Sequence, residues 1–336
     1  MTAAVRASDS RDLPALAKFL TRVYKLAPSH PLTDPRFLEW KYVWPRPGWN
    51  GSRSYILEKD GEIVSHCGVC PATLRLPGGE IVPSLTMVDW AADPATPGAG
   101  FLPFRKLMGM ADTSFAVGAI NTRAIVVRLG FREVDQAPSY SAWVRPWGEF
   151  RARPISSRSM ARLLHGWTHP AKKWKGQGAK WEAVQTSKFD SSLEPVLRCQ
   201  GRSWTTCVRT IEDLNYLLRC PHLPMTGLLL RREGQILGYC VVGRAQWEIR
   251  VLDMDLCSGE DIDWTLACGA LTQAIRLDRE ACRIRALAAT PILRRALSAN
   301  GYWAHSNEPI FIYDPKHVLD QALPIALQLF DGDSGY

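Results

Sequence analysis

The chain has 336 residues, of which 46% are hydrophobic and 22% charged, and its formal net charge is +8. This is the composition of a globular protein with ample core material, and the length suggests about two domains of roughly 150 residues each. No apolar run approaches the roughly 18 residues that cross a membrane, and the charged first dozen residues lack the apolar core of a signal peptide. We therefore expect a cytoplasmic protein without transmembrane segments, in which nine scattered cysteines are reduced thiols.

The first part of the chain predicts alternating helices and strands. Apolar residues at helical spacing predict a helix over 10–24, and a second helix over about 34–43 ends before Pro45. Runs separated by Asp60-Gly61 and Gly78-Gly79 predict three antiparallel strands. The expected elements after the second helix are strands near 53–59, 62–76 and 80–92, a helix to about 111, a strand at 115–120, a helix at 122–129 and one bent or two short strands at 132–144.

The second part of the chain repeats the first. The segment YILEKDGEIVSHCGV at 55–69 aligns without a gap with LLLRREGQILGYCVV at 228–242. Shorter matches keep the same order on both sides: 37–45 with 213–221, and 128–131 with 298–302. Matches in one order over about 130 residues indicate a tandem duplication. The second copy extends from about 182 to 314, and an amphipathic segment at 317–330 predicts a terminal helix.

A basic segment joins the copies. Ten lysines and arginines lie between Arg145 and Lys188, against only two acids, and four tryptophans are interspersed among them. Such a mixture could bind nucleic acid, a glycan phosphate or an anionic membrane surface. The simpler interpretation is a solvated connector between domains.

The order strand, two helices, three antiparallel strands, helix, strand, helix, strand resembles the GNAT superfamily of CoA-dependent N-acyltransferases. The resemblance covers nearly the whole of both copies. The segment FLEWKYVWP also resembles acyltransferases encoded with bacterial surface-polysaccharide genes. The resemblance implies an α/β fold of two tandem GNAT-like domains with mixed, mostly antiparallel central sheets. The expected divisions are a GNAT-like domain at 1–146, a basic Trp-rich linker at 147–181, a degenerate GNAT-like domain at 182–315, and a C-terminal helix and tail at 316–336.

The resemblance also implies a site for acetyl-CoA or another acyl-CoA in the first copy. The superfamily binds the pyrophosphate at a turn of pattern Arg/Gln-x-x-Gly-x-Gly/Ala, where backbone N–H groups at a helix N-terminus face the phosphates. Here the turn reads PGAGFL, which keeps Gly100 but has Pro97 and Leu102 at the flanking positions, so the motif is half matched. A turn that needs glycine for its geometry alone is the alternative. The cofactor-binding candidates are Val88, Trp90, Ala91, Gly98, Ala99, Gly100, Phe101, Leu102, Arg105 and Asn121.

The second copy has a different residue pattern at the same turn. Its sequence, LCSGEDIDW, contains Gly259 followed by Glu260, Asp261 and Asp263. Acids suit the positive end of a helix dipole but repel a pyrophosphate. We therefore expect the second copy to serve as a structural or acceptor-binding partner and not to bind CoA in the usual way.

Three residues are candidates for acid–base chemistry. Asp89 lies in the strand PSLTMVDWAAD, whose backbone amides would polarise the thioester, and an apolar setting would raise the pKa of a catalytic base there. The alternative for Asp89 is an aspartate bonded to a loop amide. His66 is the second candidate, or else an ordinary half-buried histidine. The family's acid is a tyrosine in the last helix; this helix has none, and Tyr140 is a poor substitute.

The sequence thus predicts an N-acyltransferase that acts on a small-molecule or glycan amine, such as an amino sugar in polysaccharide biosynthesis. We expect no metal, because Cys67 and Cys70 lack a second pair of ligands at zinc spacing. One alternative is a Fem-type transferase that takes its acyl group from aminoacyl-tRNA. The basic linker would suit a nucleic-acid partner, but the long helical hairpin of those enzymes is not evident, so this partner is not favoured. The other alternative is a non-catalytic GNAT-like binding protein.

Overall fold

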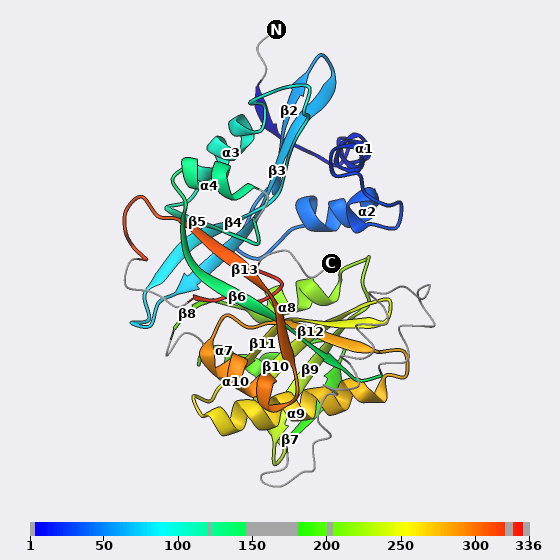
Figure 1. Cartoon of the computed structure of the whole chain (residues 1–336), viewed down its shortest axis with the longest axis vertical. Coiled ribbons are helices and arrows are strands. Elements are labelled where there is room, and N and C mark those ends of the chain that lie inside the picture. The colour runs from blue at the N-terminus through cyan, green and yellow to red at the C-terminus, as the bar shows by residue number, and fades with distance from the viewer. Residues whose placement is uncertain (1–3, 120–121, 146–180, 200–203, 320–324, 332–336) are drawn as a thin grey trace.

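The computed structural model describes residues 4–119, 122–145, 181–199, 204–319 and 325–331. Within these residues a single 14-stranded sheet runs through both halves of the chain, with helices packed on its faces (Figure 1). Its main path has the order β1-β2-β3-β4-β5-β13-β6-β12-β11-β10-β9-β7, and β8 joins β3 and β14 at the side. The expected α/β class with mixed, mostly antiparallel strands is confirmed. The two central sheets are fused into one.

The first half contains the expected elements in the expected order, with ends shifted by a few residues. Helix α1 packs Leu16 and Leu20 into the core and ends where Lys25 adopts a left-handed φ of 54°. The elements are β1 (Val5–Ala7), α1 (Leu13–Tyr24), η1 (Pro31–Thr33), α2 (Pro35–Leu38), the π-helical turn η2 (Glu39–Val43), β2 (Ser54–Lys59), β3 (Glu62–Arg75), β4 (Ile81–Ala92), α3 (Phe101–Met108), β5 (Thr113–Val117), α4 (Arg123–Arg128) and β6 (Arg132–Trp143).

The second half repeats the pairing of the first. Strands β2, β3 and β4 are antiparallel and β4 runs parallel to β5; likewise β9, β10 and β11 are antiparallel and β11 runs parallel to β12. None of the described helices is long and apolar enough to span a membrane. The elements are β7 (Trp181–Thr186), η4 (Ser191–Leu193), α7 (Glu194–Leu197), β8 (Thr205–Cys207), α8 (Ile211–Leu218), β9 (Met225–Arg232), β10 (Gln235–Ala245), β11 (Glu248–Leu256), α9 (Asp261–Leu277), β12 (Arg283–Leu287), α10 (Pro291–Ala299), β13 (Trp303–Tyr313) and β14 (Ile325–Ala326).

The two halves exchange their last strands. Strand β6 of the first half pairs antiparallel with β12, with Tyr140 opposite Ala286. Strand β13 of the second half pairs antiparallel with β5, with Phe311 opposite Ala116. The exchanged strands also pair with each other at the centre of the sheet (Figure 1). Each half is therefore completed by a strand from the other.

The predicted C-terminal helix is wrong for the part of the segment that the structure describes. Residues 325–331 form the short strand β14, parallel to β8, followed by turns. The side chains of Ile325, Leu327 and Leu329 are all buried in one core cluster with Leu252. Phe330 is buried in the same cluster, so nearly the whole segment is enclosed as extended chain and turns.

Cysteine pairing also differs from the expectation. Cys199, just after α7, forms a disulfide with Cys257, just after β11, with 5.3 Å between the two Cα atoms. The other seven cysteines are free and buried. The expectation of reduced thiols therefore holds for those seven and is wrong for this pair. Most of the basic linker, residues 146–180, lies outside the described residues.

Candidate active site

A β-bulge places Asp89 on β4. In the β3–β4 ladder His66 is opposite Ala91, whereas Gly68 is opposite Val88, so β4 carries one extra residue across from Cys67. Asp89 has a φ of 48°, in the left-handed region that residues other than glycine seldom adopt. A bulge with such a backbone conformation turns its side chain and amides away from the regular ladder. The bulge therefore gives Asp89 a different orientation from that of its neighbours on β4.

The bulge lies where β4 separates from β5. These strands pair only over Ser84–Thr86 against Thr113–Phe115. Strand β4 continues to Ala92, and from Val88 onward it has no strand partner on this side among the residues the structure describes. The backbone groups of the bulge therefore face an open strand edge.

The Asp89 carboxylate is held by two neighbouring side chains. The Lys41 ammonium forms an ion pair with Oδ2, and the Tyr42 hydroxyl donates a hydrogen bond to the same oxygen. The Lys41 side chain is 5% exposed and that of Asp89 13%. No described group bonds to Oδ1. The second carboxylate oxygen is therefore available to a ligand.

The pKa of Asp89 is below its ordinary value. Burial alone would raise this pKa, but the charge of Lys41 and the hydrogen bonds from Lys41 and Tyr42 lower it by more. The expectation of a raised pKa is therefore wrong. Its cause is the Lys41 ammonium, which the sequence of β4 does not reveal.

The π-helical turn η2 brings Lys41 and Tyr42 to the bulge. Tyr42 lies over Gly68, where a Cβ atom would be 2.7 Å from the Tyr42 ring. Only glycine allows this close approach. The Arg53 guanidinium fixes the turn by donating to the carbonyl oxygens of Lys41 at 3.0 Å and Trp44 at 2.8 Å. π-helical turns occur frequently at functional sites.

His66 is fully buried and holds the bulge from beneath. Its Nδ1 is 2.9 Å from the Asp89 carbonyl oxygen, which can only accept, so Nδ1 carries the proton; Nε2, 3.0 Å away, accepts from the Ser54 hydroxyl. Burial lowers the pKa of His66 to about 4, so the ring is neutral at pH 7. Both nitrogens are thus engaged inside the protein. This favours the interpretation of His66 as a satisfied core residue.

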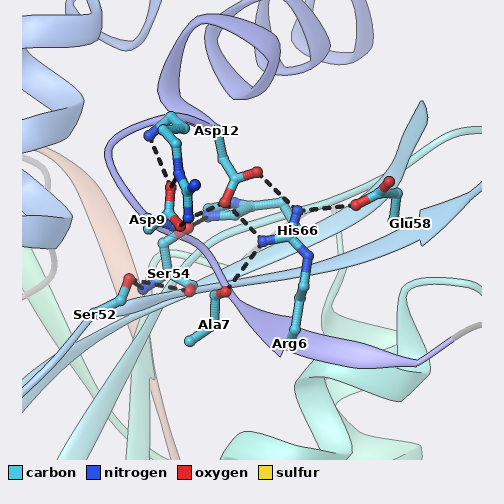
Figure 2. Close-up of polar contacts among 9 residues, drawn as sticks. Arg6, Ala7, Asp9, Asp12, Ser52, Ser54, Glu58 and His66 are labelled. Carbon is cyan, nitrogen blue, oxygen red and sulfur yellow. Dashed lines mark hydrogen bonds and ion pairs between the residues drawn. The ribbon is translucent and has the colours of Figure 1, made fainter. Parts of the chain in front are cut away.

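A charged network fixes the elements around His66. Figure 2 shows Arg6 of β1 between Asp12, at the start of α1, and Glu58 of β2, close to His66 and Ser54. The guanidinium lies 2.7 Å from the Asp12 carboxylate and 2.9 Å from that of Glu58. The network ties β1 to the beginning of α1 and to β2, next to the strand that carries His66.

In the turn before α3, the local geometry by itself explains why both Gly98 and Gly100 are glycine. Gly98 has a φ of 83°, and a Cβ atom on Gly100 would lie 3.0 Å from the Trp90 indole nitrogen, which donates to the Gly100 carbonyl oxygen. Phe101 and Leu102 are 44% and 49% exposed, and Arg105 is exposed at the same helix start. Ala99, by contrast, is buried, and its N–H bonds within the turn.

The remaining candidates fall in different places. Val88 and Ala91 are buried on β4, beside the bulge. Tyr140 is buried among residues of the second half, because β6 crosses to β12; the structure does not bring it to Asp89. Asn121 lies outside the described residues. No cluster of His, Cys, Asp and Glu suited to a metal occurs among the side chains that the structure describes.

The second half carries a counterpart of Asp89. Ser65 and Gly238 are equivalent in the repeat, and their partners across the ladder are Ala92 and Leu256, three residues after Asp89 and Asp253. Asp253 is buried and accepts from Arg209 at 2.6 Å and from the Tyr239 hydroxyl at 2.7 Å. Tyr239 corresponds to His66.

The chain's own C-terminal segment fills the space beside this counterpart. The Phe330 amide donates to the Leu252 carbonyl oxygen at 3.1 Å, and the Gln328 side chain donates to that of Met254 at 3.0 Å. Asp331 binds Arg209 at 2.5 Å. The remaining cavity measures only about 20 Å³. Residues 325–331 thus occupy the edge of β11 that corresponds to the open edge of β4.

The acids at the start of α9 are matched by arginines. Asp261 pairs with Arg295 at 2.7 Å, and Asp263 pairs with Arg232 at 2.8 Å. Ser258 also donates to Asp263 at 2.7 Å. The turn that corresponds to Gly98–Leu102 is therefore engaged in the protein's own ion pairs.

Comparisons with protein-family models and with curated proteins found no match. Among solved structures, a GCN5-related N-acetyltransferase from Anabaena variabilis is similar with a TM-score of 0.61 at 11% identity, covering 93% of this chain and 73% of that one. The N-myristoyltransferase of Saccharomyces cerevisiae with bound myristoyl-CoA gives a TM-score of 0.63 at 10% identity, covering 93% and 82%. A putative acetyltransferase from Pyrococcus horikoshii gives 0.57 at 11%, covering 94% and 90%. The fold is that of the GNAT N-acyltransferases.

Lys41 and Tyr42 are the functional candidates that sequence reasoning missed. Both belong to the segment FLEWKYVWP, for which the sequence indicates a short helix before a proline and a family resemblance, but no site residue. A lysine between two aromatic residues, on a helix that is otherwise buried, was the available signal, because a buried ammonium requires a carboxylate partner.

Proposed function

We propose that the protein is a GNAT-type N-acyltransferase that transfers an acyl group from acyl-CoA to an amine, with its active site in the first half. The observation that carries the proposal is the bulge at Asp89, where an ionised carboxylate lies beside the open edge of β4. The fold shared with N-acetyltransferases and N-myristoyltransferases supports it.

The proposed cofactor site follows the same strand into α3. Acyl-CoA supplies the acyl group as an activated thioester, which would lie along the β4 edge near Val88–Ala91. The pyrophosphate would lie at the turn Gly98–Leu102, where Arg105 provides an exposed positive charge. The Ala99 and Phe101 amides of this turn already donate to the carbonyl oxygens of Thr96 and Gly98, and Pro103 has no N–H. Both glycines are explained without a phosphate, so the support for this site comes from the exposed helix start and the fold.

The proposed mechanism is direct attack of the amine on the thioester carbonyl. Backbone N–H groups of the bulge would stabilise the developing oxyanion. The C–N bond forms, the C–S bond breaks, and the proton lost by the amine balances the one gained by the CoA thiolate. Asp89, with its lowered pKa, is ionised at neutral pH and is a weak base. Its Oδ1 atom is therefore better suited to orienting the acceptor ammonium than to removing its proton.

The proposal also assigns different roles to the two halves of the chain. The C-terminal segment covers the second-half counterpart of the site, and the ion pairs at the start of α9 occupy the second turn. We propose that the second half contributes to acceptor binding. An amino sugar of polysaccharide biosynthesis as the acceptor rests on the resemblance of residues 37–45 alone.

Calorimetric titration with acetyl-CoA and longer acyl-CoAs tests the proposal. The wild-type protein is expected to bind at least one of them. Gly100→Val, which would displace Trp90 and the turn, is expected to weaken binding by about tenfold or more. The matched control is Gly259→Val at the second-half turn, where a Cβ atom has nothing within 4 Å. Absence of binding to folded wild-type protein, or equal losses in the two variants, would contradict the proposal.

A further inference from the structure

One face of the second-half sheet carries a cluster of arginines. Ile284 and Ala286 of β12 pack into the core beneath α9 and α10. Because side chains alternate along a strand, Arg283 and Arg285 lie on the opposite face. In the parallel register, Arg250 of β11 is next to Arg285. We call the surface formed by Arg250, Arg283 and Arg285 the arginine face.

The arginine face has more positive charge than its own acid balances. Buried Glu248 accepts from Arg250 at 2.9 Å and from Arg283 at 2.7 Å. Glu248 thus serves two arginines, and Arg285 lies alongside, where Glu308 of β13 supplies a second nearby negative charge. Like charges on neighbouring strand positions are destabilising. The arrangement therefore favours an additional anion at this face.

Of the three arginines, Arg285 has the weakest hydrogen bonding within the protein. Its hydrogen bond to the Ser139 hydroxyl is long, at 3.4 Å, and its Nε atom is buried with no acceptor among the described residues. Trp143 opposes Arg283 on the same face, and its indole nitrogen is likewise buried without an acceptor. Burial lowers the pKa of Arg285. Buried polar groups without partners are rare in native proteins, and both groups here are donors that require an acceptor.

His222, which follows α8, contacts helix α2 of the first half. The pKa of His222, lowered by burial, also responds to the charges of Arg250 and Asp34, and the His222 ring packs edge-on against Phe37 of α2 at 5.7 Å. The pKa of His30, also lowered by burial, responds to Asp89, Lys41 and His222. The ring contact with Phe37 brings His222 of the second half against the first half, which carries the proposed active site.

We propose that the arginine face binds an oxyanion of the acceptor, a phosphate or a carboxylate, while the acceptor amine lies at Asp89. The planar guanidinium of Arg285 presents two parallel donors, which match such an anion. The position of the amine rests on the proposed function, whereas anion binding at Arg285 does not.

Titration with inorganic phosphate, at fixed ionic strength, tests this proposal. Shifts of the arginine Nε–H signals in ¹H–¹⁵N correlation NMR spectra would report binding. We expect saturable binding by the wild-type protein and a loss of about tenfold or more in affinity for Arg285→Met. Arg279→Met, at an exposed position in the turn after α9, is the matched control and is expected to bind like the wild type. Because the Nε–H signals of the arginine face are the ones followed, phosphate bound at the turn before α3 does not contribute to this readout.

A parallel titration with acetate distinguishes the two anions: tighter phosphate binding indicates a phosphorylated acceptor, and tighter acetate binding a carboxylated one. The proposal is overturned if no saturable binding occurs or if Arg285→Met binds like the wild type. Arg285→Lys keeps the charge but lacks the planar guanidinium. Its phosphate affinity is expected to lie between those of the wild type and Arg285→Met, and this variant replaces Arg285→Met if the latter does not fold.

The acyl-CoA affinity of Arg285→Met is expected to match that of the wild type. Phosphate binding that depends on Arg285 in a protein that binds no acyl-CoA would overturn the proposed function and leave the anion site standing.

Discussion

A buried neutral histidine makes the stability of the bulge depend on pH. The pKa of His66 is lowered to about 4 from an ordinary value near 6.5. Between these two values the unfolded chain binds a proton that the folded protein does not. The stability due to His66 is therefore fully present above about pH 6.5 and is lost as the pH falls from 6.5 to 4.

The free energy of unfolding is therefore expected to fall more steeply with acid in the wild type than in His66→Gln. Between pH 7 and pH 4 the additional loss should be about 3 kcal/mol, which corresponds to the shift in pKa. Urea titrations of both proteins across this range measure it. Parallel curves for the wild type and His66→Gln would contradict the prediction.

At the residue scale, the sequence led to Asp89 and His66 because both lie in strands whose position the repeat defines. It did not lead to Lys41, because that contact joins a helical turn to a distant strand and leaves no local pattern. Lys41, which the sequence analysis missed, determines that the pKa of Asp89 is lowered and not raised. An apolar strand alone would raise this pKa, and one buried ammonium reverses the effect.

At the element scale, the exchange of β6 and β13 makes the two halves depend on each other. Without β13, β5 would lose its antiparallel neighbour, and without β6, β12 would lose its own. Strand β6 is buried over the residues that pair with β12, and β13 is largely buried over those that pair with β5, so their removal exposes apolar surface as well as unpaired backbone groups.

Fragments 1–145 and 181–336 are therefore expected to unfold without a cooperative transition when each is prepared alone. Mixed during refolding, they should form a one-to-one complex with a cooperative transition. Circular dichroism and size-exclusion chromatography measure both properties. Cooperative unfolding of fragment 1–145 by itself would show that β6 can pair within its own half.

The order of elements was predictable because each helix and strand has its own periodicity and turn residues. The exchange was not predictable, since SYSAWV and PIFIYD both read as half-buried strands that would fit beside either β5 or β12. The C-terminal segment was misjudged for a related reason. Its apolar residues satisfy a loose helical pattern, and only the space beside β11 determines that they bind as an extended chain.

At the scale of the whole molecule, the two halves pair their strands in the same pattern but differ in what lies beside the corresponding strand edges. In the first half, the β4 edge beside Asp89 is open. In the second, residues 325–331 bind along β11, and Arg209 is buried between Asp253 and Asp331. Removing one carboxylate from such a buried ion network typically costs about 3 kcal/mol or more, because the remaining charges are less well compensated.

We therefore expect one acyl-CoA per chain and a structural role for the C-terminal segment. Equilibrium dialysis with labelled acyl-CoA should give a stoichiometry of one. Asp331→Ala should lower the free energy of unfolding by about 3 kcal/mol while leaving acyl-CoA affinity unchanged, because the affected cluster belongs to the second half. Asp9→Ala, whose partner Arg11 is highly exposed, is the matched control and should cost far less. Two bound acyl-CoA molecules per wild-type chain, or equal stability of Asp331→Ala and the wild type, would contradict this account of the second half.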